Sequence, residues 1–422
     1  MLSLALFVTI LPSAMAQQTP TEPSSKSKPD LAENKTAVTV QTPAQIEFLE
    51  THIRFESDGS SRKEVHARVR INTELGVRQF ARLNFDYNRA FETVDIPLAR
   101  ITHAGGGRAD ILPSAISDST NPAVGDASAY QDVRRKTVRI LGLQPTDQLE
   151  YRVITSTAHA PLAPDFYLFH TFAKDAIVTQ EIFELDLPAS RDLQLRINPE
   201  TPPASQDKSA SGTGARTIYR WGRTETEAPP AVDKTRPAIS SEPDVALTTF
   251  KSWKQLSSRL AQIFAPGDEI APGVVKKFAD LTATTKTPEE KVEALYDFVS
   301  LKIATLDLPL GSNGFRARAP VDILSAGYAT PEDKMVLLAA LLRAAKLPPI
   351  VALAGQPDVA ETLLPRPSVF THALIWTGKE GPGFWLDPSI EVAPFRMVAS
   401  NLRGKPAFLL LSETENAGLS RW

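Results

Sequence analysis

The sequence of 422 residues contains no cysteine. This absence excludes disulfides, metal sites built on thiolates and any cysteine nucleophile. An excess of charge of one sign is also lacking, since 46 Lys and Arg against 49 Asp and Glu leave a net charge of −3. Such a balance does not provide the basic surface typical of nucleic-acid-binding proteins, so we expect no nucleic acid among the partners.

Long hydrophobic runs are scarce as well. Residues 2–11 form an apolar run with two polar interruptions, and the small residues Ala-Met-Ala follow at 14–16. This pattern predicts a secretory signal peptide over residues 1–16, cleaved after Ala16, although no Lys or Arg precedes the run. No later segment reaches the roughly 18 apolar residues of a membrane helix. We therefore expect a periplasmic or secreted protein with no membrane span in the mature chain.

Composition divides the rest of the chain into four segments. Residues 17–43 are poor in large apolar side chains, which is typical of a disordered linker. Residues 44–245 are predicted to form a β-rich domain, and residues 246–411 a domain of helices and strands. Residues 412–422 are predicted to be a tail.

The predicted β-rich domain shows repeated alternation of apolar and polar residues. Alternation with a period of two is typical of strands with one buried face. Turn residues separate the segments, as at Gly105-Gly106-Gly107. Several such strands over about 200 residues predict an antiparallel β sandwich-like domain. The clearest alternating segments are 66–72, 137–141, 149–154 and 193–197.

The period changes to that of helices beyond Phe250. Apolar residues of 253–263 recur at helical spacing, which predicts an amphipathic helix. Thr287-Pro288-Glu289-Glu290 and Thr330-Pro331-Glu332-Asp333 both begin with a capping residue followed by proline, a combination typical of a helix start. The run 335–342 is apolar on nearly every face, which predicts a helix buried in a core. Three strands are expected after it, over 350–354, 370–376 and 384–390, so this domain is α+β.

A family resemblance rests on three short motifs. Tyr-Ala-Thr-Pro-Glu-Asp-Lys at 328–334, before a Leu-rich run, is similar to the motif Tyr-Gly-Asp-Cys-Lys-Asp-Lys of bacterial transglutaminase-like proteins. Phe-Thr-His-Ala at 370–373 resembles their Phe-Asn-His strand, and Trp-Leu-Asp-Pro at 385–388 resembles their Leu-Asp-Pro strand. The segment of about 44–245 resembles the uncharacterised β-rich domain that often precedes such domains. The resemblance implies a papain-like α+β fold for residues 246–411.

The resemblance also implies a Cys-His-Asp triad, in which His is the base and Asp fixes its tautomer. In an alignment without gaps, Pro331 occupies the position of the nucleophilic cysteine, and the chain contains no cysteine elsewhere. Proline offers no nucleophile but suits the first turn of a helix. The change therefore keeps the helix start and removes the reaction.

His372 and Asp387 match the other two members of the triad. If their strands form a hairpin that closes near Thr377 and Pro382, the two side chains lie directly opposite each other, within contact distance. One interpretation is a retained pair of base and orienting acid. The other, which we favour without a nucleophile, is a relic pair that only contributes to packing.

Thr330 is the one candidate for a replacement nucleophile. A hydroxyl needs a well-placed base to act as a nucleophile. Its place before Pro-Glu-Asp marks it as a helix cap, and we favour that role. The other histidines lack the spacing of a metal site, and we expect no cofactor. They are His52, His66, His103, His159 and His170.

The main hypothesis is an exported, catalytically inactive transglutaminase-like protein that serves as a binding or scaffolding module in the cell envelope. Its partner would be a peptide, a protein or a cell-wall ligand. The first alternative is a residual acyl-transfer or hydrolase enzyme that uses Thr330 or a water activated by His372. The second is an adhesion or interaction protein that acts through the β-rich domain.

Overall fold

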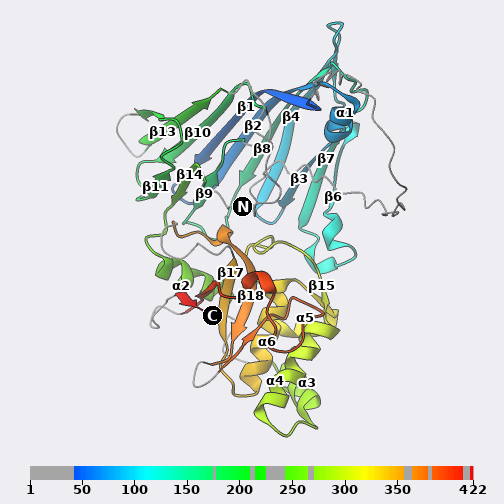
Figure 1. Cartoon of the computed structure of the whole chain (residues 1–422), viewed down its shortest axis with the longest axis vertical. Coiled ribbons are helices and arrows are strands. Elements are labelled where there is room, and N and C mark those ends of the chain that lie inside the picture. Colours follow the sequence, from blue (N-terminus) through cyan, green and yellow to red (C-terminus); the bar gives the residue numbers. More distant parts are fainter. Residues whose placement is uncertain are drawn as a thin grey trace, which may run out of the picture.

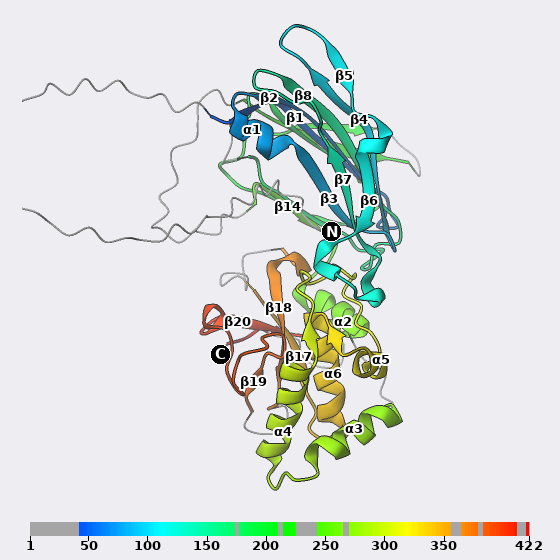
Figure 2. The same cartoon turned by 90° about the vertical axis from the view of Figure 1, so that its right-hand side faces the viewer.

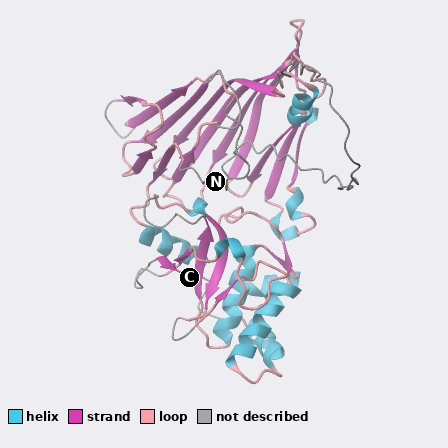
Figure 3. Cartoon of the chain, in the orientation of Figure 1, coloured by secondary structure: helices cyan, strands magenta, loops and turns pink. Residues whose placement is uncertain are grey.

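The computed structural model describes residues 42–173, 177–209, 214–224, 243–264, 270–355, 364–378, 383–411 and 419–421. Figure 1 shows two parts, a β-rich half that ends with β14 and a C-terminal half that begins with α2. Most helices belong to the C-terminal half (Figure 3). The predicted signal peptide (1–16) and most of the predicted linker (17–43) lie outside the described residues.

An eight-stranded sheet is the largest element of the β-rich half. The predicted alternation is confirmed in β2 and β8, where every second residue around Ala67 and Tyr151 is buried. In sheet order the strands are β12 (Ser205–Ser209), β13 (Arg216–Arg223), β10 (Glu181–Pro188), β1 (Ala44–Phe55), β2 (Ser61–Ile71), β8 (Gln148–Thr157), β4 (Glu92–Thr102) and β5 (Arg108–Asp110).

The prediction of an antiparallel sandwich is wrong at one pair of strands. β1 and β10 run parallel, with His52 beside Glu184, whereas the other neighbours in this sheet are antiparallel. The reason lies in the path of the chain. After β8 it leaves this sheet to form β9, and it returns along the free edge of β1 as β10.

Two three-stranded sheets cover one face of the large sheet, which makes a sandwich (Figure 2). Apolar side chains of both layers form two clusters, one around Tyr151 and Phe85 and one around Phe183 and Leu247. α1 (Glu74–Phe80) connects β2 to the first small sheet. The small sheets are β3 (Arg82–Asn88), β7 (Val133–Arg139) and β6 (Ile116–Thr120), and β11 (Gln194–Ile197), β14 (Val245–Thr248) and β9 (Tyr167–His170).

The C-terminal half packs helices against a five-stranded sheet. Its helices are α2 (Trp253–Phe264), α3 (Pro272–Thr282), α4 (Pro288–Asp297), α5 (Pro320–Ala326) and α6 (Pro331–Ala344). The sheet order is β19 (Trp385–Leu386), β18 (Phe370–Trp376), β17 (Ile350–Gly355), β20 (Pro406–Leu409) and β21 (Leu419–Arg421). β15 (Ala304–Thr305) pairs in parallel with β16 (Tyr328–Ala329). β21 lies within the predicted tail, whose residues 412–418 and 422 are outside the described chain.

The predicted helix starts are confirmed. Thr287 and Glu290 form a complete capping box at α4, and Thr330 caps α6 with Pro331 at its first position. Residues 332–342 of α6 are buried without interruption, as the apolar run predicts, but the buried stretch also includes three charged residues of the first turn. Such charges need partners inside the protein, because burying an unpaired charge is costly.

The two halves share an interface. Leu162 and Tyr167 of the β-rich half belong to the same apolar cluster as α6. Asn88 donates to the carbonyl of Ser312 at 2.9 Å, and Arg259 donates to the carbonyl of Ala163 at 3.0 Å. The start of α6 therefore lies in a part of the molecule to which both halves contribute.

Candidate functional site

Thr330 and Pro331 begin α6 directly after the short strand β16. The hydroxyl of Thr330 accepts a hydrogen bond from the backbone N–H of Asp333 at 3.4 Å, so its predicted role as a cap is confirmed. Only 3% of Thr330 is exposed. Pro331 is half-buried and lacks the N–H that a helix start does not need.

Asp333 and Lys334 follow in the first turn of α6, and both are fully buried. The carboxylate of Asp333 accepts hydrogen bonds from the backbone N–H of Arg318 at 2.8 Å, from its Nε at 2.6 Å, and from the hydroxyl of Tyr130. Lys334 Nζ donates to the carbonyl of Ser300 at 3.0 Å. Burial lowers the pKa of Lys334 to about 8.

His372 lies near the start of β18 and is half-buried. Its Nδ1 is hydrogen bonded to the hydroxyl of the neighbouring Thr371 at 2.7 Å. Asp387 follows β19 and is fully buried. Its Oδ1 accepts from the backbone N–H of Ser389 at 3.1 Å and from the Ser389 hydroxyl at 2.5 Å, whereas its Oδ2 has no hydrogen-bond partner among the described residues.

The predicted opposition of His372 and Asp387 is wrong. Ile375 pairs with Leu386 and Trp376 with Trp385, so the continued register places Asp387 beside Leu374, two residues beyond His372. The hairpin closes differently because the Thr377 hydroxyl is hydrogen bonded to both the N–H and the carbonyl of Phe384.

A shift of two residues keeps both side chains on one face, as diagonal rather than direct neighbours. The predicted strand over 384–390 is also shorter in the structure, since β19 contains only Trp385 and Leu386. Beyond it, the Ser389 backbone turns toward Asp387 instead of continuing the ladder.

Asp387 is the residue at which the separate parts of the site meet. Burial raises the pKa of its carboxyl, and the hydrogen bonds from Ser389 and the nearby His372 and Lys334 oppose that rise. The Tyr296 hydroxyl donates to its main-chain carbonyl at 3.2 Å. The structure thus brings an acid, an imidazole and an amine into one neighbourhood beside α6, without a hydrogen bond between His372 and Asp387 among the described contacts.

Tyr130 and Arg318 are the site residues that the sequence did not predict. Tyr130 lies 203 positions before Asp333, in another half of the chain, so neither spacing nor periodicity links the two. Arg318 lies in the loop before α5, where an isolated arginine is usually exposed. The only hint in the sequence was the predicted buried run that begins at Met335, directly after Asp333 and Lys334.

Four of the other histidines contact protein groups. His52, His66 and His103 contact carboxylates of Glu184, Glu150 and Asp147. His170 stacks on Phe183 with ring centroids 3.9 Å apart, and burial lowers its pKa to about 3. No group of three or more His, Asp or Glu residues that could hold a metal is found in the described ranges.

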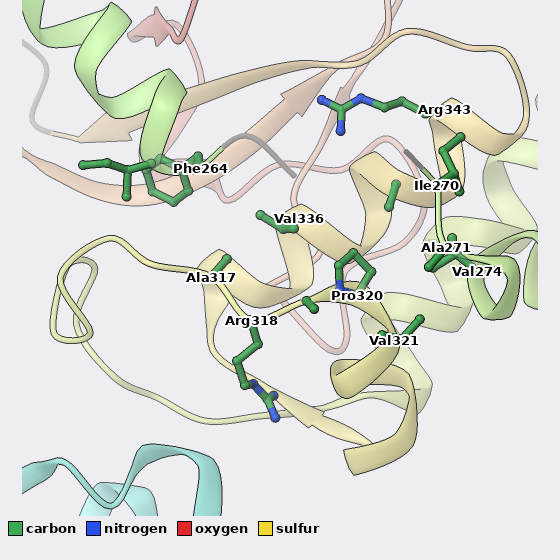
Figure 4. Close-up of a pocket in the computed structure, with 13 residues that line it drawn as sticks. Phe264, Ile270, Ala271, Val274, Ala317, Arg318, Pro320, Val321, Val336 and Arg343 are labelled. Carbon is green, nitrogen blue, oxygen red and sulfur yellow. The ribbon is translucent and has the colours of Figure 1, made fainter. Parts of the chain in front are cut away.

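A cavity of about 270 Å³ lies next to the site, among α2, α3, α5 and α6 (Figure 4). Its walls are mostly apolar, with Arg318 and Arg343 on opposite sides. Arg318 lines this cavity and also binds Asp333. The cavity therefore adjoins the first turns of α6. The apolar lining includes Phe264, Ile270, Val274, Pro320 and Val336.

None of the helices in the described part of the chain is long and apolar enough to cross a bilayer. Residues 57–230 match the family described as "Domain of Unknown Function with solved-structure structure (DUF3857)". This match covers much of the β-rich half and does not extend to α6, His372 or Asp387. No curated protein matches the chain.

Among solved structures, the chain is similar to a "putative protease" from Parabacteroides distasonis, with 16% identity and a TM-score of 0.72. The similarity covers 87% of this chain and 70% of that one, so it shows a shared fold across both halves. A "putative cysteine protease" from Cytophaga hutchinsonii is 15% identical over 61% of this chain and 83% of its own, with a TM-score of 0.27. An M1 zinc metallopeptidase from Deinococcus radiodurans is 13% identical over 72% and 64%, with a TM-score of 0.26.

Proposed function

We propose that this chain is an exported, catalytically silent relative of transglutaminase-like proteins, which binds a peptide, protein or cell-wall ligand without converting it. The observation that carries the proposal is Pro331. It occupies the first position of α6, where the resembling family has its nucleophile, and the chain contains no cysteine to replace it. A thiolate at a helix start would be stabilised by the helix dipole and by a nearby imidazolium, and here the thiolate is missing.

The state of the two other triad positions supports the same conclusion. An enzyme of this type needs Asp to hold the imidazole in one tautomer and orientation. Instead, His372 Nδ1 is bonded to Thr371, and Asp387 is bonded to Ser389. His372 and Asp387 lie near each other, but the hydrogen bond between them that catalysis requires is not among the described contacts.

The same geometry leaves capacity for binding. Asp387 Oδ2 is a buried acceptor without a partner in the described chain, and such a group gains free energy when a donor reaches it. His372 is half-buried and lies close enough to affect the charge of Asp387. Because Asp387 is fully buried, a ligand donor such as a peptide amide or a sugar hydroxyl would reach this oxygen only when the hairpin opens locally.

The alternative of a residual hydrolase depends on Thr330 or on an activated water. The Thr330 hydroxyl is directed to the N–H of Asp333, and the residue is almost fully buried. A nucleophilic hydroxyl would instead need to be within hydrogen-bond reach of a base. This geometry favours the capping role and counts against Thr330 as the nucleophile of the first alternative. The proposed export rests on the N-terminal sequence alone.

The direct test is an assay of the purified full chain for acyl transfer, amidase and peptidase activity. We expect no turnover above buffer for the wild type or for His372→Ala. Turnover by the wild type that His372→Ala abolishes would overturn the proposal. Asp132→Ala, which changes an exposed pair with Arg89 in the β-rich half, is the matched control.

Binding is tested with the same variants. Immobilised cell-wall fragments and a peptide array would be probed with wild type, His372→Ala and Asp132→Ala. We expect a ligand that His372→Ala loses and Asp132→Ala retains. Equal binding by all three proteins would move the binding site away from His372 and contradict the proposal.

A further inference from the structure

Tyr130 connects the β-rich half to the start of α6. It ends the short 3-10 helix η3 (Ser128–Tyr130) and is only 1% exposed. Its hydroxyl donates to the carboxylate of Asp333 and accepts a hydrogen bond from the backbone N–H of Thr330 at 3.3 Å. A single side chain from one half thus contacts both the capping residue and the buried acid of a helix in the other half.

Arg318 contacts both Tyr130 and Asp333 and so stabilises their hydrogen bond. Its guanidinium lies 4.8 Å from the centre of the Tyr130 ring and 4.9 Å from that of Tyr328. It also donates to Asp333 Oδ2 at 2.6 Å and to the Tyr328 carbonyl. A guanidinium that stacks on aromatic rings while it binds a carboxylate is well suited to a fixed joint, because its planar shape serves both contacts.

Tyr328 completes the contact. Its hydroxyl accepts from the backbone N–H of Ala129 at 3.3 Å and lies 3.4 Å from the hydroxyl of Ser128. Apolar side chains of both halves pack beside it, in a cluster of Val124, Ala127, Tyr130, Val133 and Leu308. Tyr328 and Asp333 belong to the motif that resembles the transglutaminase-like family, and both are engaged with η3 and Arg318.

We infer that Tyr130 is a plug, built into the β-rich half, that closes the start of α6 and controls access to it. Asp333, Arg318 and Tyr328 form the socket that holds the plug. With the plug in place, only 3% of Thr330 is exposed, although the neighbouring Pro331 is half-buried, and Thr330 becomes accessible when η3 leaves the socket. The motif residues are then used to join the two halves. Tyr130 would control access to the start of α6 in this way whichever ligand the protein binds.

The absence of cysteine allows a sharp test. Thr330→Cys places the only thiol of the chain beneath Tyr130, and its reaction with Ellman's reagent under native conditions reports access to the start of α6. We expect slow labelling of Thr330→Cys, because local opening limits the rate while Tyr130 is in place, and labelling at least about tenfold faster when Tyr130→Ala is added. Tyr130→Phe, which keeps the ring and loses both hydroxyl contacts, should give an intermediate rate.

A second thiol position separates opening of the plug from unfolding. Ala339→Cys lies in the fully buried middle of α6 and should label slowly with or without Tyr130→Ala. Equal rates for Thr330→Cys with and without Tyr130→Ala, while Ala339→Cys stays slow, would overturn the inference. If Tyr130→Ala also exposes Ala339→Cys, the Tyr130→Phe background decides, and an unchanged rate of Thr330→Cys there overturns the inference as well.

Discussion

The start of α6 and the end of the β18–β19 hairpin are two sides of one candidate site, and they differ in how their polar groups are satisfied. At the start of α6, both oxygens of Asp333 are hydrogen bonded, and the Thr330 hydroxyl caps the helix. At the hairpin, Asp387 keeps one oxygen without a partner in the described chain, and the His372 ring is hydrogen bonded to its neighbour Thr371 instead. The polar groups at the start of α6 are satisfied by protein, whereas the carboxylate of Asp387 at the hairpin still has bonding capacity.

The largest effect is expected at the start of α6. Asp333→Ala would leave Arg318 buried without its carboxylate and Tyr130 without its acceptor. We expect a loss of about 3–5 kcal/mol in the free energy of unfolding, the range for a broken buried ion pair. Urea unfolding of the full chain measures it. Asp132→Ala removes an ion pair whose side chains are 52% and 49% exposed, and it should change little. Equal effects of the two variants would show that the socket contributes no special stability.

Glu181, a buried acid of the β-rich half, provides a reference for how a buried carboxyl changes stability with pH. Burial raises the pKa of Glu181 from 4.5 to about 7, although the Ala173 N–H binds its carboxylate. Because the folded-state pKa is the higher one, stability is fully present below pH 4.5 and falls as the pH rises through 7. We expect Glu181→Gln to be more stable than wild type at about pH 8, by on the order of 3 kcal/mol, with the gap closing toward about pH 4. A gap that does not depend on pH would contradict this.

Asp387→Asn tests the hairpin side of the comparison. The pKa of Asp387 is also raised by burial, so the wild type again loses stability as the pH rises above the ordinary range of an aspartate. We expect the variant to gain on the wild type with rising pH, but less than Glu181→Gln does, because Ser389 and the nearby His372 and Lys334 favour the charged form. Thermal unfolding at several pH values checks this, and a variant that is less stable at every pH would show that the carboxylate is well satisfied.

The smallest expected effect compares two helix caps. Thr330→Ala and Thr287→Ala should each cost about 1 kcal/mol, the usual value for a lost threonine cap. Thr330 has the longer hydrogen bond, 3.4 Å against 3.1 Å, but it is buried while the other is exposed. We therefore expect Thr330→Ala to cost at least as much as Thr287→Ala in urea unfolding. No loss at Thr330 would remove the evidence that its hydroxyl is committed to capping.

The features that the sequence predicted correctly are those that depend on residues close together in the sequence. Thr287 and Thr330 mark helix starts because caps act within one turn, and the apolar run 335–342 predicts a buried helix by composition alone. The hairpin register was missed because it depends on how Thr377 binds Phe384, which alternation does not specify. Tyr130 was missed because its contacts with Asp333 form only after both halves have folded.

The parallel pairing of β1 with β10 has a consequence for folding of the chain. His52 and Glu184, which face each other across these strands, are 132 positions apart. A ribosome adding about 5–20 residues per second needs roughly 7–26 s to cover that span, and until then one edge of β1 has no partner. An unpaired strand edge invites intermolecular association. Chains that end before Glu181 should therefore aggregate more readily than chains that include Pro188, which sedimentation of both truncated forms would reveal.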